Sequence, residues 1–332
     1  MPVYPATLAA RDRFVLERRT PRPARDPWRF QDLIVEDERT ADGPVARVAT
    51  LVLTGRECPW RCVMCDLWRN TVEFDTPEGA IAGQVAAARD ALNQRRDIVT
   101  QLKLYNAGSF FDARAVPERD YDGVASALAG LARVVVESHP ALVGRRVTQF
   151  LESLDRRTAG GAPQLEVAMG LETAHPDALE RLNKRMTVDQ FARAAESLKG
   201  WGVALRVFLL ISPPFVPADE QRAWLRQSVD VAFCCGASVV SIIPTRPGNG
   251  AIEGLAEAGL FRPPTITDIE QSAEAALAEA GGRGRLFVDL WNLEQLARCR
   301  RCFSARRDRL HSMNIEQRVR PAVDCPECEA RG

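Results

Sequence analysis

Residues 46–65 read ARVATLVLTGRECPWRCVMC, a strand-length apolar run followed closely by three cysteines. Val48–Leu53 is apolar at nearly every position, which is typical of a strand buried on both faces of a parallel sheet. Parallel sheets carry their chemistry at the carboxyl ends of their strands. The three cysteines are therefore predicted to lie at the functional edge of the sheet.

Five more runs of strand length follow, separated by helical patterns. They are Gln101–Tyr105, Arg133–Glu137, Leu165–Met169, Leu205–Ile211 and Val239–Ile243. Thr76-Pro77-Glu78 predicts one helix start, and Thr187 with Gln190 forms the capping-box signature of another. Six repeats of strand then helix predict an α/β fold, a partial (β/α)6 barrel, because parallel neighbours need helical crossovers. A doubly wound open sheet is the alternative.

The 332 residues suit one barrel with a small appendage. Residues 1–45 are rich in proline and arginine, and we expect an extended arm there. Residues 46–285 are predicted to form the core barrel, and 286–332 a C-terminal extension. Cys234 and Cys235 lie on an apolar helical stretch and are expected to be buried core thiols.

The charge balance excludes a strong global field, because 44 basic residues face 44 acidic ones. Only three of the basic residues are lysines, so a cluster of arginines in this chain is weak evidence for an anion-binding site. No signal peptide or membrane span is visible, and nine cysteines without an export signal favour a reducing compartment, so a cytoplasmic protein without a membrane partner is expected.

Cys58, Cys62 and Cys65 place three thiols within a span of eight residues that follows the first predicted strand. Such a set suits a soft metal centre. Three thiolates would leave one iron of a four-iron cubane open, and an open position is what catalytic metals keep. A zinc site completed by a distant ligand, or three buried thiols, are the alternatives.

The C-x3-C-x2-C spacing after the first of six β/α units resembles the signature loop of the radical S-adenosylmethionine superfamily. The resemblance implies a 4Fe–4S cluster on these cysteines, S-adenosylmethionine on its open iron and reductive cleavage to a 5′-deoxyadenosyl radical. It also implies an electron donor such as flavodoxin or ferredoxin. Many members carry an aromatic residue near the adenine just before the last cysteine, where this chain has Met64, which can still pack on a base.

The ends of the other predicted strands carry further matches to this superfamily. Asn106-Ala107-Gly108-Ser109 resembles the place of a Gly-Gly-Glu-like motif that receives the methionine amino group, although Ser109 replaces the glutamate. Gly170-Leu171-Glu172-Thr173 is similar to the elongator-catalytic-subunit-like branch, in which Glu172 would bind the cofactor's amino group or ribose. Ile243, in Ile243-Pro244-Thr245, is expected to shape the adenine or substrate pocket.

Two residues are candidates for catalysis beyond the cofactors. His139, one of three histidines, follows the third predicted strand and could transfer a proton at neutral pH. Arg206 lies within the fifth and could bind a carboxylate or phosphate. A hydrogen-bonded structural imidazole is the alternative for His139.

Two C-x2-C pairs occur near the C-terminus, Cys299 with Cys302 and Cys325 with Cys328. Four thiolates can close one tetrahedral site, so zinc is expected, with an auxiliary Fe–S cluster as the alternative. Arginines between the pairs could contact phosphate.

The segment Leu104–Asp112 also resembles the archaeosine-forming radical enzymes of archaeal transfer RNA. The expected function is therefore that of a radical enzyme acting on a nucleoside in transfer RNA. Radical modification of a small metabolite or peptide, and a metal-stapled RNA-binding protein without catalysis, are the alternatives.

Overall fold

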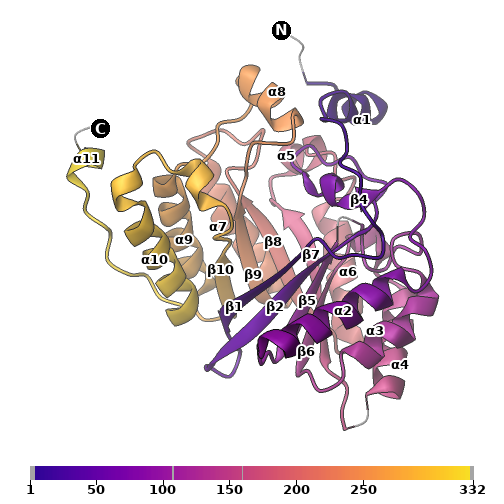
Figure 1. Ribbon diagram of the computed structural model, residues 1–332. Coiled ribbons are helices and arrows are strands. Elements are labelled where there is room, and N and C mark those ends of the chain that lie inside the picture. The colour runs from indigo at the N-terminus through magenta and orange to yellow at the C-terminus, as the bar shows by residue number, and fades with distance from the viewer. Residues whose placement is uncertain (1–3, 107, 159, 330–332) are drawn as a thin grey trace.

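The computed structural model describes residues 4–106, 108–158 and 160–329. One eight-stranded sheet dominates it, in the order β1-β2-β5-β6-β7-β8-β9-β10 (Figure 1). The strands are β1 (Asp32–Arg39), β2 (Val45–Leu53), β5 (Gln101–Asn106), β6 (Arg133–Glu137), β7 (Gln164–Glu172), β8 (Ala204–Ile211), β9 (Ala237–Pro244) and β10 (Arg285–Val288).

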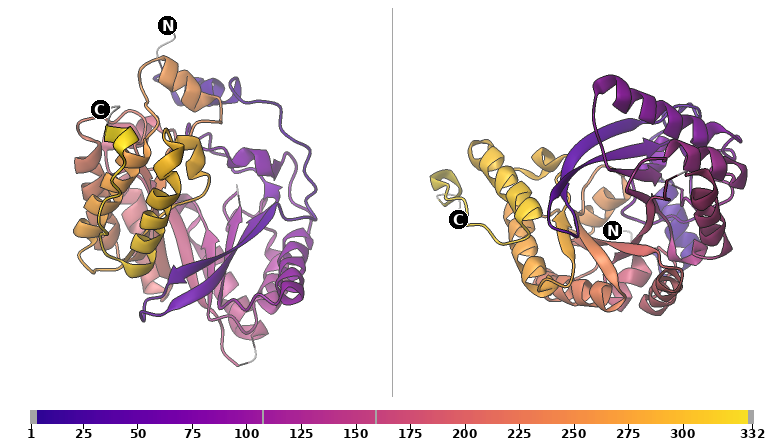
Figure 2. Two further views of the ribbon diagram at one scale, coloured as in Figure 1. Left: turned by 60° about the vertical axis from the view of Figure 1, so that its left-hand side comes forward. Right: turned by 90° about the horizontal axis from the view of Figure 1, so that it is seen from below.

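All six predicted runs are parallel neighbours in this sheet, from β2 to β9. Seen from below, the sheet curls with its helices on the outside (Figure 2). The outer helices are α2 (Ala80–Arg95), α3 (Tyr121–Ala127), α4 (Arg145–Arg157), α6 (Val188–Gly200), α7 (Gln221–Cys234) and α9 (Ile266–Ala280). The predicted partial barrel is confirmed, and the open sheet is not the fold.

The sheet extends beyond residues 46–285 at both of its edges. β1 comes from the N-terminal arm and pairs antiparallel with β2, from Asp32 opposite Val52 to Arg39 opposite Val45. β10 adds a short parallel strand beside β9. β1 escaped sequence reasoning because its sequence, DLIVEDER, carries acidic side chains where an ordinary core strand carries apolar ones.

α10 (Arg300–Glu316) packs against both β1 and β10 and so covers the gap between the two sheet edges (Figure 1). The amide of Asn314 accepts from Val288 N at 2.8 Å and donates to Val288 O at 2.9 Å. Gln317 makes the same pair of bonds with Leu286, at 2.7 and 2.8 Å. These two side chains satisfy the backbone groups that an edge strand leaves unpaired.

Local signals were confirmed in one helix and not in another. The Thr187–Gln190 capping box is present at the start of α6. α2 begins at Ala80 rather than at Thr76, because the Asp120 carboxylate caps it by accepting the backbone N–H groups of residues 79, 81 and 82. The prediction of two buried thiols was wrong, since Cys234 is exposed and Cys235 is only half-buried.

A second, smaller apolar core lies beside the main one. It joins the arm helix α1 (Leu8–Leu16) to α8 (Ala251–Glu257) and to the segment after α5 (Pro176–Arg181). Its members include Tyr4, Phe14, Val63, Leu182, Leu210, Ile252 and Leu255. Since Val63 belongs to the three-cysteine loop, this core packs directly against that loop. No helix in the described part of the chain is long and apolar enough to cross a membrane.

Candidate active site

The three-cysteine loop runs between two short paired strands, β3 (Gly55–Arg56) and β4 (Thr71–Val72), with the turn η1 (Leu67–Asn70) inside it. Its first anchor is Glu57, whose carboxylate receives Arg19 at 2.8 Å, Arg22 at 2.5 Å and Arg61 at 3.2 Å. Arg19 and Arg22 come from the N-terminal arm. The arm therefore holds the loop by ion pairs. Because three guanidinium groups share one largely buried carboxylate, they form a network, which stabilises more than an isolated surface ion pair does.

The loop backbone is fastened from two further sides. Val63 N donates to Leu182 O at 3.0 Å, and the Asn183 amide donates to Arg61 O at 2.8 Å. Asn249 donates to Val63 O at 2.8 Å. Residues from the turn after α5 and from the segment just before α8 thus fix the loop backbone.

The three thiols are spread rather than compact. Cys58, Cys62 and Cys65 are half-buried, and they do not form a group whose sulfurs all lie within 4.8 Å. A single zinc ion would draw its sulfurs to about 3.8 Å, given Zn–S bonds near 2.3 Å. Burial raises the pKa of Cys62 to about 12, so these thiols need a cation to ionise. The three spread thiols therefore fit an iron–sulfur cluster better than a single zinc ion.

A buried ionic group lies beside this loop, at the carboxyl ends of β6 and β7. Lys184 Nζ donates to Glu172 Oε1 at 2.5 Å. Burial alone would lower the pKa of Lys184, but Glu172 and Cys62 raise it to about 12. Gly170 leaves room for the pair, because a Cβ there would lie 2.4 Å from Lys184 Nζ. Burial raises the pKa of the neighbouring Glu137 to about 7.

The backbone is strained in the same region. Glu172, Asn183, Arg185 and Ser212 all have positive φ, between 54° and 67°. Side chains with a Cβ adopt this conformation at a cost of about 1–3 kcal/mol, and such residues cluster at functional sites. Glu172 ends β7 and Ser212 directly follows β8, while Asn183 and Arg185 lie in the turn after α5.

The Asn106–Ser109 segment lies at the end of β5 as predicted. Both polar side-chain atoms of Asn106 are buried without a partner among the described residues. Gly108 is required by close approach, since a Cβ would lie 2.4 Å from Arg56 O. Ser109 Oγ accepts from His139 N at 2.8 Å, so it holds the neighbouring loop. Ala107, also predicted to contact the cofactor, lies outside the described residues.

His139 does not have the free nitrogen that proton transfer requires. Nδ1 accepts from Ala141 N at 3.1 Å and Nε2 faces Lys184 O at 3.0 Å, which demands a proton on Nε2. Burial, aided by the Lys184 ammonium, lowers the pKa of His139 to about 3. Its ring stacks on Trp60 of the cysteine loop, with centroids 3.7 Å apart. This geometry is that of a structural imidazole rather than a proton donor.

Arg206 is likewise already engaged. Its guanidinium lies 2.6 Å from Glu38 and 2.6 Å from Glu166, and its side chain is 3% exposed. Lys103 completes the network at 2.5 Å from Glu38. Burial alone would lower the pKa of Arg206, but the two carboxylates raise it. The group closes the interior of the barrel between β1, β5, β7 and β8, and it leaves Arg206 no free face for a substrate anion.

Met64 and Ile243, both predicted to shape the adenine pocket, border the same apolar cluster. Each is half-buried and packs against the second apolar core. They come from the cysteine loop and from the end of β9, which are far apart in sequence. The structure thus supplies one apolar wall at the mouth of the barrel.

The four C-terminal cysteines form a compact group. All four sulfurs lie within 4.8 Å of one another, with Cys299 to Cys325 at 3.9 Å and Cys302 to Cys328 at 3.6 Å. These separations match one tetrahedral metal ion. By contrast, Arg306 and Arg309 between the pairs are not free for phosphate, because both bind Glu270 at 3.2 and 3.1 Å.

Sequence reasoning missed Lys184, Glu137 and Trp60. One signal was available for Lys184. The chain uses arginine almost throughout, yet Lys103 and Lys184 are lysines at buried positions. A compact ammonium fits there where a planar guanidinium would not.

No family model matches the chain. It is similar to the archaeosine synthase subunit beta of Methanosarcina acetivorans, 28% identical over 296 residues that cover 84% of this chain and 80% of the relative. The subunit of the same name from Thermococcus kodakarensis is 26% identical over 174 residues, 51% of each chain. This similarity confirms the predicted resemblance to the archaeosine-forming enzymes.

Solved structures of similar fold include the Elp3 protein of Methanocaldococcus infernus, with a TM-score of 0.47 and 14% identity. The match covers 69% of this chain and 54% of that one. Methylornithine synthase is another, with a TM-score of 0.48 and 13% identity over 71% of this chain and 63% of the other.

Proposed function

We propose that this chain is a radical enzyme that cleaves S-adenosylmethionine at a 4Fe–4S cluster held by Cys58, Cys62 and Cys65. The observation that carries the proposal is the spread, preformed triad of thiols beside a group of one ammonium and two carboxylates, in which Lys184 and Glu172 are buried and Glu137 is half-buried. When bound, the cluster and S-adenosylmethionine supply one-electron reductive cleavage of a carbon–sulfur bond.

Lys184, Glu172 and Glu137 match the charges of an α-amino acid group. Lys184 can donate to a carboxylate, and the two glutamates can accept from an ammonium. Asn106, with its unpartnered amide, adds a donor and an acceptor at the same edge. The burial of the group excludes water, which strengthens each of these contacts.

Met64 and Ile243 offer an apolar wall for a flat ring, while His139 and Trp60 position the loop. The stacked pair joins the segment after β6 to the cysteine loop and so helps to fix where the thiols lie. Arg206, Glu38 and Glu166 close the barrel interior and order β1. The roles of His139, Trp60, Arg206, Glu38 and Glu166 are positioning roles, since the contacts of these side chains are with other protein groups.

A nucleoside of transfer RNA is the proposed substrate. The support is the similarity over most of both chains to a relative named archaeosine synthase subunit beta. The reaction also needs an electron donor, for which flavodoxin or ferredoxin is the proposed class.

The four C-terminal cysteines are proposed to hold a structural zinc ion. Their sulfur separations of 3.6 and 3.9 Å fit one ion with closed coordination, which leaves no open position for chemistry.

The test is anaerobic reconstitution of the full chain, with iron, sulfide and zinc counted before assay. We expect about four irons and one zinc ion per chain, and 5′-deoxyadenosine once a strong reductant is added. Reconstituted protein that binds zinc alone, or that forms no 5′-deoxyadenosine, would contradict the proposal. A Lys184→Met variant should bind S-adenosylmethionine more weakly by calorimetry while keeping its iron.

A further inference from the structure

The interior of the barrel is closed at one level and open at the next. The closed level is the ionic network of Arg206, Glu38, Glu166 and Lys103, in which the Glu38 side chain is only 7% exposed. Glu36 lies two residues before Glu38 on β1, so both side chains share one face of the sheet. Lys103 Nζ donates to Glu36 Oε1 at 3.0 Å, which shows that this face is the interior one. Since Glu36 is nevertheless 35% exposed, the described side chains leave the space beside it unfilled.

Three aromatic side chains lie around this open space. Tyr105 on β5 and Phe208 on β8 meet edge to face, with ring centroids 5.8 Å apart. Trp291, which follows β10, donates its indole N–H to Glu36 Oε2 at 3.4 Å. All three rings are half-buried, and no two of their strands are neighbours in the sheet. They therefore converge from different sides of the barrel, and we call Glu36, Tyr105, Phe208 and Trp291 the middle layer.

The middle layer lies between the ionic network and the proposed cofactor site. On β8, Phe208 comes two residues after Arg206 of the network and two residues before Leu210. Leu210 belongs to the apolar core against which Met64 and Ile243 pack. Because alternate residues of a strand share a face, these side chains follow one another along the interior at steps of about 7 Å. A molecule held beside Phe208 would therefore lie next to the proposed cofactor.

The charges around the middle layer indicate a neutral occupant. Lys103 and Arg206 are each bound by two carboxylates, so neither cation is free for a phosphate. The Glu36 carboxylate accepts one bond at each oxygen and retains a further acceptor site on each. Burial raises the pKa of Tyr105 to about 12, so its hydroxyl keeps its proton and can donate. Aromatic rings, paired acceptors and a donor together suit a flat heterocycle with neighbouring N–H groups.

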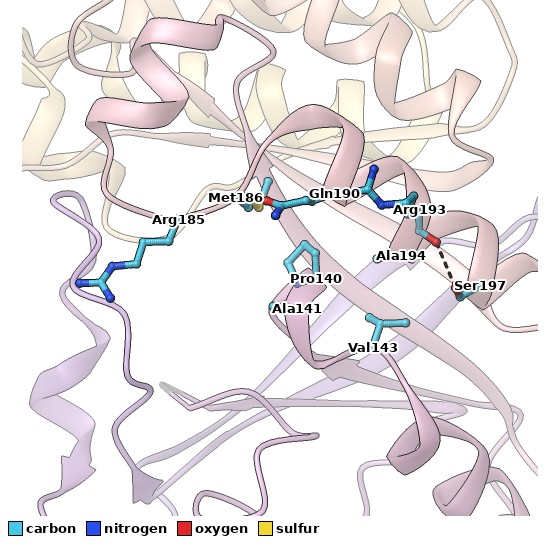
Figure 3. Close-up of a pocket in the computed structure, with 9 residues that line it drawn as sticks. All are labelled: Pro140, Ala141, Val143, Arg185, Met186, Gln190, Arg193, Ala194 and Ser197. Carbon is cyan, nitrogen blue, oxygen red and sulfur yellow. Dashed lines mark hydrogen bonds between the residues drawn. The ribbon is translucent and has the colours of Figure 1, made fainter. Parts of the chain in front are cut away.

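A second hollow, of about 250 Å³, lies between η3 (Pro140–Leu142) and α6 (Figure 3). Met186 and Ala194 line it, and both belong to the main core between the helices and the sheet. The Arg185 side chain at its edge points away from the other labelled residues and is already paired with a carboxylate of α1. This hollow is on the helix side of the sheet, so it is a poorer place for a substrate than the barrel interior.

We propose that Glu36 and Tyr105 are specificity-determining residues, which hold the base of the substrate nucleoside beside the cofactor. This inference rests on the proposed function and deepens it, because it names the edge of the base that the barrel recognises. Glu36 accepts two neighbouring N–H groups, such as N1–H and the 2-amino group of guanine, while Trp291 and Lys103 hold its carboxylate in place. The base packs on the rings of Tyr105 and Phe208. A base without the second N–H group leaves one acceptor unpaired and binds more weakly.

The test is an NMR titration of the reconstituted full chain without S-adenosylmethionine or reductant. The probes are guanosine, inosine, which lacks the 2-amino group, and adenosine. We expect guanosine to bind about tenfold more tightly than inosine, and Glu36→Gln to remove this preference by weakening guanosine binding about tenfold. Tyr105→Phe, which keeps the ring, should weaken binding of all three nucleosides about threefold.

Two further variants make the test specific. Trp291→Phe removes the N–H group that orients Glu36, so it should lower the preference for guanosine about threefold even if Glu36→Gln fails to fold. Asp37→Asn is the matched control, because Asp37 is the next residue of β1 and lies on the opposite face. Its side chain is 44% exposed, and this variant should bind all three nucleosides as wild type does.

Several outcomes would overturn the inference. They are undetectable guanosine binding, equal affinity of wild type for guanosine and inosine, and equal loss in Asp37→Asn and Glu36→Gln. Equal weakening of all three nucleosides by Glu36→Gln would also overturn it, because Glu36 would then only support the barrel. The proposed function is tested separately, since these titrations require no cleavage. Absence of 5′-deoxyadenosine from wild type would remove the radical chemistry and leave the nucleoside result unchanged.

Discussion

The two cysteine sites of this molecule are built in opposite ways. The N-terminal loop is held by protein: Glu57 gathers three arginines, Asn183 and Asn249 bind its backbone, and an apolar core packs beneath it. Its thiols remain spread. The C-terminal cysteines are compact, and the segment that carries Cys325 and Cys328 has few other anchors. A preformed site can receive and release a reactive group, whereas four compact thiols are an arrangement that one bound metal ion would stabilise.

The largest expected effect separates the two sites chemically. Cys62→Ala should lower the rate of 5′-deoxyadenosine formation by at least about a thousandfold, because the cluster loses a ligand. Zinc content and melting temperature should stay close to wild type, since the loop keeps its protein anchors. Metal analysis and an anaerobic cleavage assay measure both. Loss of zinc along with iron would contradict the independence of the two cysteine sites. Cys234→Ala, which changes a cysteine outside both sites, is the matched control.

The converse change should act on stability rather than on chemistry. Cys325→Ala should remove the zinc ion and lower the free energy of unfolding by about 4 kcal/mol, as loss of a structural metal does. Iron content should remain. Denaturant unfolding with metal analysis measures this, and limited proteolysis should show cleavage confined to the last residues. Cleavage spread over the barrel would show that the two sites are not independent.

The arm's contribution to the preformed loop can be tested next. Glu57→Ala leaves Arg19, Arg22 and Arg61 without their shared carboxylate, and should cost about 3 kcal/mol of unfolding free energy. Reconstituted iron should also be lost more readily on gel filtration. Glu73→Ala removes a 4.0 Å pair whose carboxylate is 81% exposed, so it should change little. Equal effects of the two changes would mean that the arm does not fasten the loop.

The smallest expected effect is on the pH dependence of the unfolding free energy of the metal-free chain. Burial raises the pKa of Glu137 from 4.5 to about 7, so the native state holds a proton there that the unfolded chain releases. Stability of the metal-free chain should therefore fall as pH rises from 4.5 to 7. Glu137→Gln should remove this loss and gain about 2 kcal/mol at pH 8. Unfolding at pH 5 and pH 8 measures it, with the exposed Glu152→Gln as control. An unchanged pH slope in Glu137→Gln would contradict the assignment.

Sequence reasoning found the parts of the fold whose signal is local. The six parallel strands are continuous apolar runs, and the cysteine spacings stand out without any partner. β1 was missed because Glu36 and Glu38 face Lys103 and Arg206 inside the barrel, so the pattern reads as polar. A strand that contributes charge to a lumen cannot be recognised until its partners are known.

The candidate site could likewise be predicted only where its residues carry a local signal in the sequence. Glu172 and the cysteines follow strands directly, so their positions could be inferred. Lys184 reaches Glu172 only through the strained turn after α5, and His139 changes from a candidate acid to a structural group once Lys184 O and Ala141 N lie beside it. Roles fixed by contacts between distant segments cannot be deduced from spacing.

The side-chain amides of Asn314 and Gln317, which bond the backbone of β10, give the C-terminal extension a role besides holding the four cysteines. One helix supplies what a ninth strand would, and it does so with only two side chains. A truncation before residue 299 would leave Leu286 and Val288 as an open ribbon, ready to join the same edge of another molecule. Shortened versions of this protein should therefore self-associate, because this edge would be open to pairing with a second molecule.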